Sequence, residues 1–234
     1  MNMALEILTR QPIKFYEKQG IKFFEPFNAV DKFKKPVKLF FDETEELTTL
    51  TAENHQKKQS LYGLQFNIAK REMQGVTLAA DPRKEGLGEL LNLAALIEFH
   101  KNNLNRFKVF SLKESIQFYA RYGFKIVSDD VDYILNGLKL VMKSKNPRLE
   151  NLRRDADFFY PKIAGTQKSD DPFLKERGCE VISNYLKYLA RNNNKVDSSK
   201  LEYSSNMMFT DWEFETNRDY LNSLLDGHEI NYRV

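Results

Sequence analysis

The stretch that most constrains the fold is ELLNLAALIEFHKNNLN, at residues 89–105. Apolar residues fall at positions 90, 91, 93, 94, 95, 96, 97 and 99, so a helix over 88–102 would be apolar on nearly every face. Such a helix has to be covered on more than one side. The chain must therefore fold other elements around it. Its 234 residues are enough for one large domain, or for a domain of about 150 residues with an addition.

The composition is that of an ordinary soluble globular protein, with 41% hydrophobic and 29% charged residues. Thirty-six basic and 33 acidic residues give a formal charge of +3, which is too balanced to make nucleic acid the leading partner. The charged first twenty residues lack the apolar core of a signal peptide, and no stretch approaches the ~18–20 apolar residues that span a bilayer. We expect a cytoplasmic protein.

Cysteine and histidine give no metal or disulfide pattern. Cys179 is the single cysteine, so no intrachain disulfide can form, and the three histidines at 55, 100 and 228 have no zinc-ligand spacing. We interpret Cys179 as a small buried or half-buried thiol and expect no metal.

The front of the chain is expected to be mostly antiparallel sheet. Residues 9–20 (TRQPIKFYEKQG) predict a short helix, with Thr9 as a possible N-cap and Gly20 as its stop. The β-rich runs after it predict two hairpins. Their strands are expected at 37–43, 46–52, 61–69 and 73–80.

After the apolar helix, RFKVFSL (106–112) predicts a strand, and KESIQFYARYGF predicts a helix. Ser111 and Glu114 fit a capping box at the start of this helix, and Gly123 fits a left-handed stop. KIVSD and LKLVMK (138–143) are expected to be two closing strands.

The last 90 residues have a helical pattern. One helix is expected to start at Asn146 and Pro147 and another at Asp171, before the polar linker 192–200 and a final helix at 216–227. We therefore expect a first domain at 1–145 and a helical C-terminal extension at 146–234. This extension is the natural cover for the exposed side of the apolar helix.

The order strand, RKEGLG, helix places unobstructed backbone amides at a helix N-terminus, which is an anion site suited to a pyrophosphate. Gly86 and Gly88 lack a Cβ, and Arg83 and Lys84 add positive charge. Taken alone, the pattern also fits an ordinary tight turn. A P-loop would need Gly-Lys-Ser/Thr, and a dinucleotide fingerprint would need a third glycine, so both of those nucleotide motifs fail here.

DPRKEGLGELL, followed after one strand by SLKESIQFYARYGFKI, resembles the GNAT acyltransferase (N-acetyltransferase) superfamily over roughly residues 61–143. The acyl-CoA loop of that family, Arg/Gln-x-x-Gly-x-Gly/Ala, is matched by Arg83, Gly86 and Gly88. The helix ending Tyr-x-x-x-Gly-Phe is matched by Tyr119, Gly123 and Phe124. The resemblance implies a mixed, largely antiparallel central sheet flanked by helices, an α+β fold, in which two middle strands splay apart around acetyl-CoA.

The resemblance also implies the roles of single residues. Leu78, Ala79 and Ala80 would pair with the pantetheine amides and offer a backbone N–H to the thioester oxygen. Tyr119 would donate a proton to the departing thiolate, although its place on the apolar face of its helix fits a core residue equally well. The loop from Lys84 to Glu89 would hold the pyrophosphate, which brings in Lys84, Glu85, Gly86, Leu87, Gly88 and Glu89.

The chain departs from the family pattern in two places. Arg83 follows Pro82 directly, where many members have two more residues. Many members also have a cofactor-binding Asn near the start of the tyrosine helix, where this chain has Ser111-Leu112-Lys113, so that contact is either lost or replaced by Ser111 or Ser115. The group that takes the proton of the amine is open. Glu72, or a water relay to it, is the candidate, and a solvated charge in a turn is the alternative.

Two classes of function follow. The first is an acetyl-CoA-dependent N-acetyltransferase acting on a primary amine of an unknown acceptor. The second is a non-catalytic module on the same fold, with a vestigial or regulatory acyl-CoA site and a tail that docks a partner. The expected partners are acetyl-CoA and an amine, with no nucleic acid and no membrane, and a homodimer is left open.

FYEKQGI (15–21) and FYARYGF (118–124) share one pattern. We interpret both as the last turn of a short helix followed by a glycine stop, and we expect chemistry only at the second, which follows the glycine loop and a strand.

Overall fold

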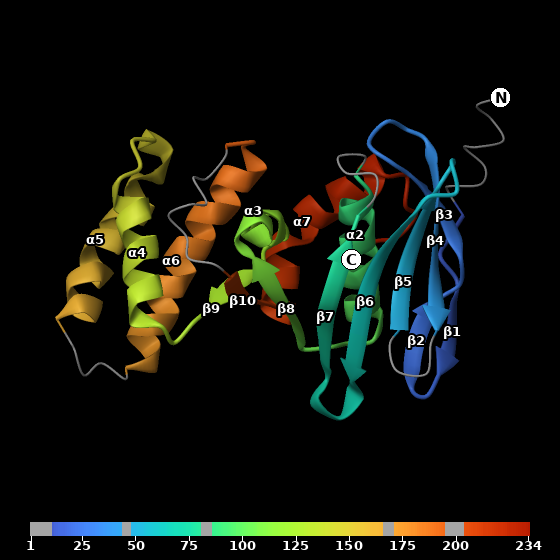
Figure 1. Ribbon diagram of the computed structural model, residues 1–234, viewed down its shortest axis with the longest axis horizontal. Helices are drawn as coiled ribbons and strands as arrows, with labels where there is room; N and C mark the ends of the chain where they lie inside the picture. Colours follow the sequence, from blue (N-terminus) through green and yellow to red (C-terminus); the bar gives the residue numbers. More distant parts are fainter. Residues whose placement is uncertain (1–10, 44–47, 81–85, 166–170, 195–203) are drawn as a thin grey trace. The chain divides into compact units, whose positions relative to one another are not determined.

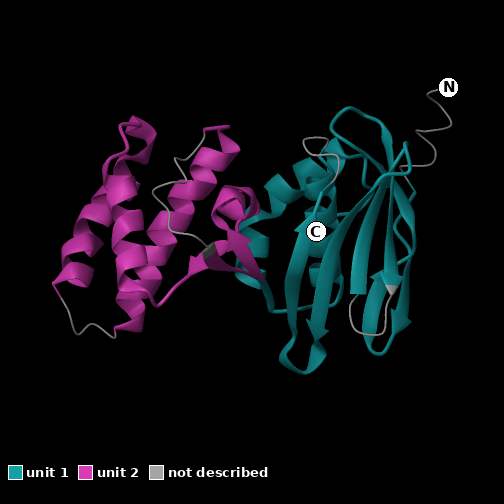
Figure 2. Ribbon diagram, viewed as in Figure 1, with its two compact units in different colours: residues 1–108, 210–234 teal, residues 109–209 magenta. Residues whose placement is uncertain are grey.

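The computed structural model describes residues 11–43, 48–80, 86–165, 171–194 and 204–234. The chain forms two compact units (Figure 2). Unit 1 consists of Met1–Lys108 with Thr210–Val234, and unit 2 consists of Val109–Phe209. The two are described separately below. The division expected from the sequence, into a domain at 1–145 and a helical extension at 146–234, stays a prediction.

Eight strands of the described chain form one sheet in the order β3-β4-β5-β6-β7-β8-β10-β9. Neighbouring strands from β3 to β7 are antiparallel, and so are β10 and β9. The expected mixed, largely antiparallel sheet flanked by helices is therefore confirmed. The strands are β3 Phe27–Val30, β4 Pro36–Glu43, β5 Thr48–Asn54, β6 Gln59–Asn67, β7 Glu72–Ala79, β8 Arg106–Leu112, β9 Lys125–Val127 and β10 Ser204–Thr210.

The helix predicted at 9–20 is wrong, because the described part of this segment opens a β-hairpin. β1 (Phe15–Lys18) pairs with β2 (Ile21–Phe24), and Lys18 lies opposite Ile21. Gln19 and Gly20 have φ of 52° and 77°, which is the geometry of a two-residue type I′ turn. Gly20 therefore turns a hairpin and does not end a helix.

Helix α2 (Leu87–Lys101) confirms the expected apolar helix and is buried along most of its length. In unit 1 it lies against β5, β6 and β7 (Figure 1). Its other side is partly covered by α7 (Asp211–Gly227), where the Phe99 and Phe214 rings lie 6.0 Å apart. The expected cover from the C-terminal region is thus confirmed for its last helix, which begins five residues earlier than predicted because Thr210 and Glu213 form a capping box.

Helix α3 (Lys113–Tyr122) ends as predicted at Gly123, which has φ of 106°. The capping box predicted at its start is wrong. The N-cap is Leu112 without a side-chain hydrogen bond, and buried Ser111 donates its hydroxyl to the Leu112 carbonyl. The helix begins one residue later than that motif would place it.

Unit 2 is mainly helical. The strand predicted at 138–143 is wrong, because these residues fall largely within helix α4 (Val131–Met142), whose buried Ile134, Leu138 and Val141 follow the helical period. A Cβ on Gly178 would lie 2.6 Å from Ile134 Cγ2, so this glycine lets α6 approach α4 closely. The remaining helices are the 3-10 turn η2 Pro147–Leu149, α5 Glu150–Ala164 and α6 Pro172–Arg191.

The expected C-terminal extension is not purely helical. Strand β10 returns to the sheet between β8 and β9, which leaves α4, α5 and α6 as an insertion between β9 and β10. The sequence SSNMMFT does not by itself predict a strand, because one apolar run of this length fits a strand or a helix equally well. None of the helices in the described chain is long and apolar enough to cross a membrane.

Candidate functional site

The candidate site is the junction between β7 and the start of α2, within unit 1. α2 begins at an N-cap Gly86 whose φ of 89° is left-handed, and this residue has no side chain with which to cap the helix. The backbone N–H groups of the first turn form the positive end of the helix dipole. Predicted Arg83, Lys84 and Glu85 lie outside the described residues.

The two glycines of this junction differ in what the structure requires of them. Gly86 needs its positive φ, which residues with a Cβ rarely adopt. Gly88 lies inside α2, and a Cβ there would meet only Ala80 Cβ and Leu78 Cδ2, both at an ordinary 3.5 Å. Neither backbone angle nor packing requires Gly88. A missing side chain at the first turn of a helix leaves room for a ligand to approach the backbone amides.

Strand β7 is irregular just before the junction. Gly63 of β6 lies opposite Thr77, but the next residue, Leu64, lies opposite Gly75, so Val76 is an extra residue in β7. Such a bulge bends the strand and disturbs its hydrogen bonding, and bulges are over-represented beside active sites. Val76 is 46% exposed, and Thr77 and Ala79 are also exposed. The end of β7 is thus accessible where the sequence predicts pantetheine contacts at Leu78, Ala79 and Ala80.

Lys32 is a cation beside the junction that the sequence argument missed. The Lys32 backbone nitrogen lies 3.4 Å from where a Gly86 Cβ would be. Asp31 fixes this turn, because its Oδ1 accepts hydrogen bonds from Phe33 N at 2.7 Å and Lys35 N at 2.9 Å. The run DKFKK at 31–35 was the available signal. The backbone and Cβ of exposed Lys32 thus lie beside Gly86, while its Nζ lies over the Phe33 ring, 4.7 Å from the ring centroid.

Glu89, predicted as part of the pyrophosphate loop, is bound within the protein. Its Oε1 lies 2.8 Å from His228 Nε2, and the other ring nitrogen of buried His228 donates to the Val30 carbonyl at 2.6 Å. Because a carbonyl only accepts, Nδ1 carries the proton of this hydrogen bond. The Glu89 carboxyl is thus held by His228 within unit 1.

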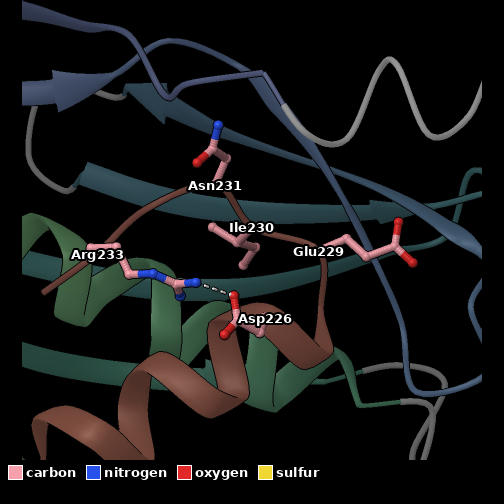
Figure 3. Close-up of a pocket in the computed structure, with 5 residues that line it drawn as sticks. All are labelled: Asp226, Glu229, Ile230, Asn231 and Arg233. Carbon is pink, nitrogen blue, oxygen red and sulfur yellow. Dashed lines mark ion pairs between the residues drawn. The ribbon is translucent and has the colours of Figure 1, made fainter.

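The C-terminal segment also forms a cavity of about 460 Å³ in unit 1 (Figure 3). The ion pair drawn there joins Arg233 to Asp226 at 2.7 Å. His228 lies within the same segment and ties it to α2 through Glu89. The sequence argument assigned nothing to these residues. The cavity is lined by Asp226, Glu229, Ile230, Asn231 and Arg233.

Predicted Glu72 lies at the start of β7, while the junction lies beyond its end. The strand rises ~23 Å from Glu72 to Ala79, at the end nearer the junction. Lys108 Nζ is 2.7 Å and Arg106 is 3.2 Å from its carboxylate, and the hydrogen bond from Lys108, with that from Arg106, holds the pKa of Glu72 below its usual value. Such a carboxylate is a weak proton acceptor at neutral pH, so these contacts argue against Glu72 as a general base.

Predicted Tyr119 and Ser115 lie on α3, in unit 2, and are described there by themselves. Tyr119 is 7% exposed, and its ring contacts Phe118 and Phe124 at centroid distances of 5.2 and 5.3 Å. Ser115 is half-buried in the first turn of the helix. The structure thus brings Leu78, Ala80, Gly86 and Gly88 together, keeps Glu72 at the far end of β7, and places Tyr119 in an aromatic cluster.

Other reactive groups offer no competing site in the described chain. Cys179 is buried as expected, and burial raises the pKa of its thiol to about 11, so it stays protonated and is a poor nucleophile. No three His, Cys, Asp or Glu residues of the described ranges are placed to share a metal ion. Comparisons with protein-family models, curated proteins and solved structures gave no match to this chain.

Proposed function

We propose that the chain is an acetyl-CoA-dependent N-acetyltransferase of the GNAT type, with the pyrophosphate of acetyl-CoA at the N-terminus of α2. The observation that carries the proposal is the first turn of this helix. Its N-cap is a left-handed Gly86, which has no side chain, and among the described residues neither packing nor backbone angle requires Gly88. Backbone amides arranged in this way suit a phosphate group. In this proposal the exposed Lys32 side chain, whose Nζ now lies over the Phe33 ring, turns toward the bound pyrophosphate.

The strand before the helix supports the same proposal. The bulge at Val76 bends β7, and Thr77 and Ala79 beyond it are exposed, which leaves room beside the strand for the pantetheine arm. In the proposed reaction, the lone pair of a neutral amine attacks the thioester carbon. Backbone N–H groups near Leu78 to Ala80 stabilise the oxyanion, and the thiolate of CoA leaves. The nitrogen of the tetrahedral intermediate is positively charged and loses its proton to water, since Glu72 is held by Lys108 and Arg106, and loss of the thiolate then leaves the amide.

Tyr119 is the proposed general acid for the leaving thiolate. A phenol is protonated at neutral pH, so it needs no tuning for this role. General acid–base catalysis contributes roughly 10²- to 10⁴-fold to a rate. Tyr119→Phe should therefore lower kcat by at least ~100-fold while the Kd for acetyl-CoA stays unchanged. Tyr160→Phe, the same change on α5, is the matched control and should leave kcat unchanged.

The test is release of free thiol from acetyl-CoA in the presence of peptide, polyamine and aminoglycoside amines. Glu72→Gln should release thiol at the wild-type rate, because the proposal gives Glu72 no role in proton transfer. Loss of activity in Glu72→Gln with unchanged stability would show that Glu72 acts as the general base. Failure of wild-type protein to bind acetyl-CoA would contradict the whole proposal.

A non-catalytic acyl-CoA-binding module is the second candidate. It is favoured by one observation, the burial of Tyr119 among Phe118 and Phe124, which fits a structural side chain. The two candidates differ in one outcome. A module binds acetyl-CoA without releasing thiol to any amine, and Tyr119→Phe then changes stability alone.

A further inference from the structure

A second cavity, of about 400 Å³, lies in unit 2 at the edge of the sheet. Phe110 of β8 and Val127 of β9 contribute its apolar surface, and they are 59% and 46% exposed. The two strands lie on either side of β10, so their axes are ~9.6 Å apart. Large apolar side chains that stay exposed in a cavity of this size indicate a place for a ligand.

The rim of this cavity is acidic. Asp129 and Asp130 line it, and both are exposed. Asp130 Oδ1 accepts a hydrogen bond from Tyr133 N as the N-cap of α4. No described lysine or arginine forms a salt bridge with either carboxylate. Lys125, two residues before Val127, has its Nζ 3.7 Å from Glu180, so its charge is directed to another partner.

The inner wall adds neutral hydroxyl groups. Tyr133 and Ser205 are 6% and 5% exposed, and their hydroxyl groups form a hydrogen bond with each other. Burial raises the pKa of Tyr133, so the pair is uncharged at neutral pH. The cavity thus combines an exposed phenyl ring, two carboxylates and a hydroxyl pair, and none of its described lining residues is a lysine or an arginine.

We propose that this cavity binds an alkylammonium group together with its aliphatic stem. A phenyl ring attracts a cation over its face, and the carboxylates attract the same charge. Val127 and the Phe110 ring offer apolar contact to the methylene groups of the stem. An anion would be repelled by Asp129 and Asp130, and a neutral alcohol would gain the apolar contact alone. The site stands independently of the acetyltransferase proposal.

The test is an NMR titration of the full ¹⁵N-labelled chain with 1,5-diaminopentane and, separately, with uncharged 1,5-pentanediol, in the absence of acetyl-CoA. The diamine should shift the amides of residues 127–130 and 206 saturably, and the diol should bind at least ~5-fold more weakly. Raising NaCl from low to high concentration should weaken only the diamine. Equal binding of the two compounds, or shifts spread over the whole chain, would overturn the proposal.

Variants locate the interaction. Asp129→Asn and Phe110→Leu should each weaken diamine binding ~2- to 5-fold, since exposed charge pairs and exposed cation–π contacts are of that size. Asp132→Asn removes the same charge from α4 outside the cavity and should change binding little. Equal weakening by Asp132→Asn would mean general charge attraction and would contradict the site.

Two further arms identify the occupant. Nα-acetyl-lysine N-methylamide carries the same ammonium on a peptide unit, and its affinity relative to the diamine distinguishes a lysine side chain from a free amine as the source. Sedimentation velocity tests whether the surface pairs two copies of the chain. A dimer that Phe110→Leu dissociates, with no diamine binding, would overturn the proposal in favour of self-association.

Discussion

The two ends of α2 differ in the hydrogen bonds that their polar groups make. At the C-terminal end, Asn102 receives Lys22 N on its Oδ1 at 2.7 Å and donates to Lys22 O at 2.8 Å, and Glu98 accepts from Phe24 N at 2.9 Å. These contacts complete the free edge of β2. At the N-terminal end, the N-cap is Gly86, which has no side chain to cap the first turn. Side chains of α2 thus bind a hairpin at one end of the helix, and the described residues place no N-cap side chain at the other.

The largest predicted effect is a pH dependence of stability, and it arises at the C-terminal end of α2, where Glu98 is buried. Burial raises the pKa of Glu98 to about 8 from an ordinary value of 4.5. Because the folded pKa is the higher one, the associated stability is present below pH ~4.5 and is lost as pH rises toward 8. Between pH 5 and 8.5 the wild-type protein should lose up to about 4 kcal/mol more stability than Glu98→Gln. Urea unfolding at several pH values measures this, and parallel pH profiles of the two proteins would refute it.

Replacing Asn102, the other residue of α2 that binds β2, should lower the free energy of unfolding by less. Asn102→Ala leaves the Lys22 backbone groups without their partner and should lower the free energy of unfolding by about 1–3 kcal/mol. The binding of acetyl-CoA at the far end of α2 should not change. Asn105→Ala, three residues further on, is the matched control. A loss of acetyl-CoA affinity in Asn102→Ala would show that the two ends of the helix are coupled.

At the N-terminal end of α2, substitutions should change the free energy of unfolding less than those at Glu98 and Asn102. The effect should depend on whether Gly86 or Gly88 is replaced. Gly86→Ala forces a Cβ into a left-handed conformation and should cost about 1–2 kcal/mol. Gly88→Ala replaces a glycine within a helix without a clash, and should be neutral or stabilise by up to about 1 kcal/mol. Thermal unfolding of both variants tests this difference. Equal destabilisation by both would mean that packing requires Gly88 after all.

The sequence predicts much of the fold where periodicity and turn chemistry agree. The apolar helix, β8 and the stop at Gly123 follow from local pattern, and so do the hairpins formed by β4, β5, β6 and β7. FYEKQGI and FYARYGF share residues but not structure. The first is a hairpin, because Gln19 and Gly20 both adopt positive φ and β2 pairs back on β1, whereas the second ends a helix. Only tertiary pairing distinguishes these outcomes.

The candidate site was predictable only in its local part. The backbone of Gly86 and Gly88 follows from the order of strand, glycine and helix, which is a property of adjacent residues. Lys32 and His228 reach the same place from distant parts of the sequence, so no spacing could reveal them. Strand β10 was missed for the same reason, since its partners β8 and β9 lie far from it in the chain. The ion pairs of Glu72 likewise come from β8, more than thirty residues away.

The most direct test of the open helix end is calorimetric titration of acetyl-CoA into the wild-type protein and Gly88→Ala, with thermal unfolding of both in the absence of ligand. We predict that the wild type binds, and that Gly88→Ala keeps or gains stability while its affinity falls by at least ~10-fold, because the added methyl group blocks the approach of the pyrophosphate to the backbone amides. Equal affinity in the two proteins, or no binding by the wild type, would contradict the account.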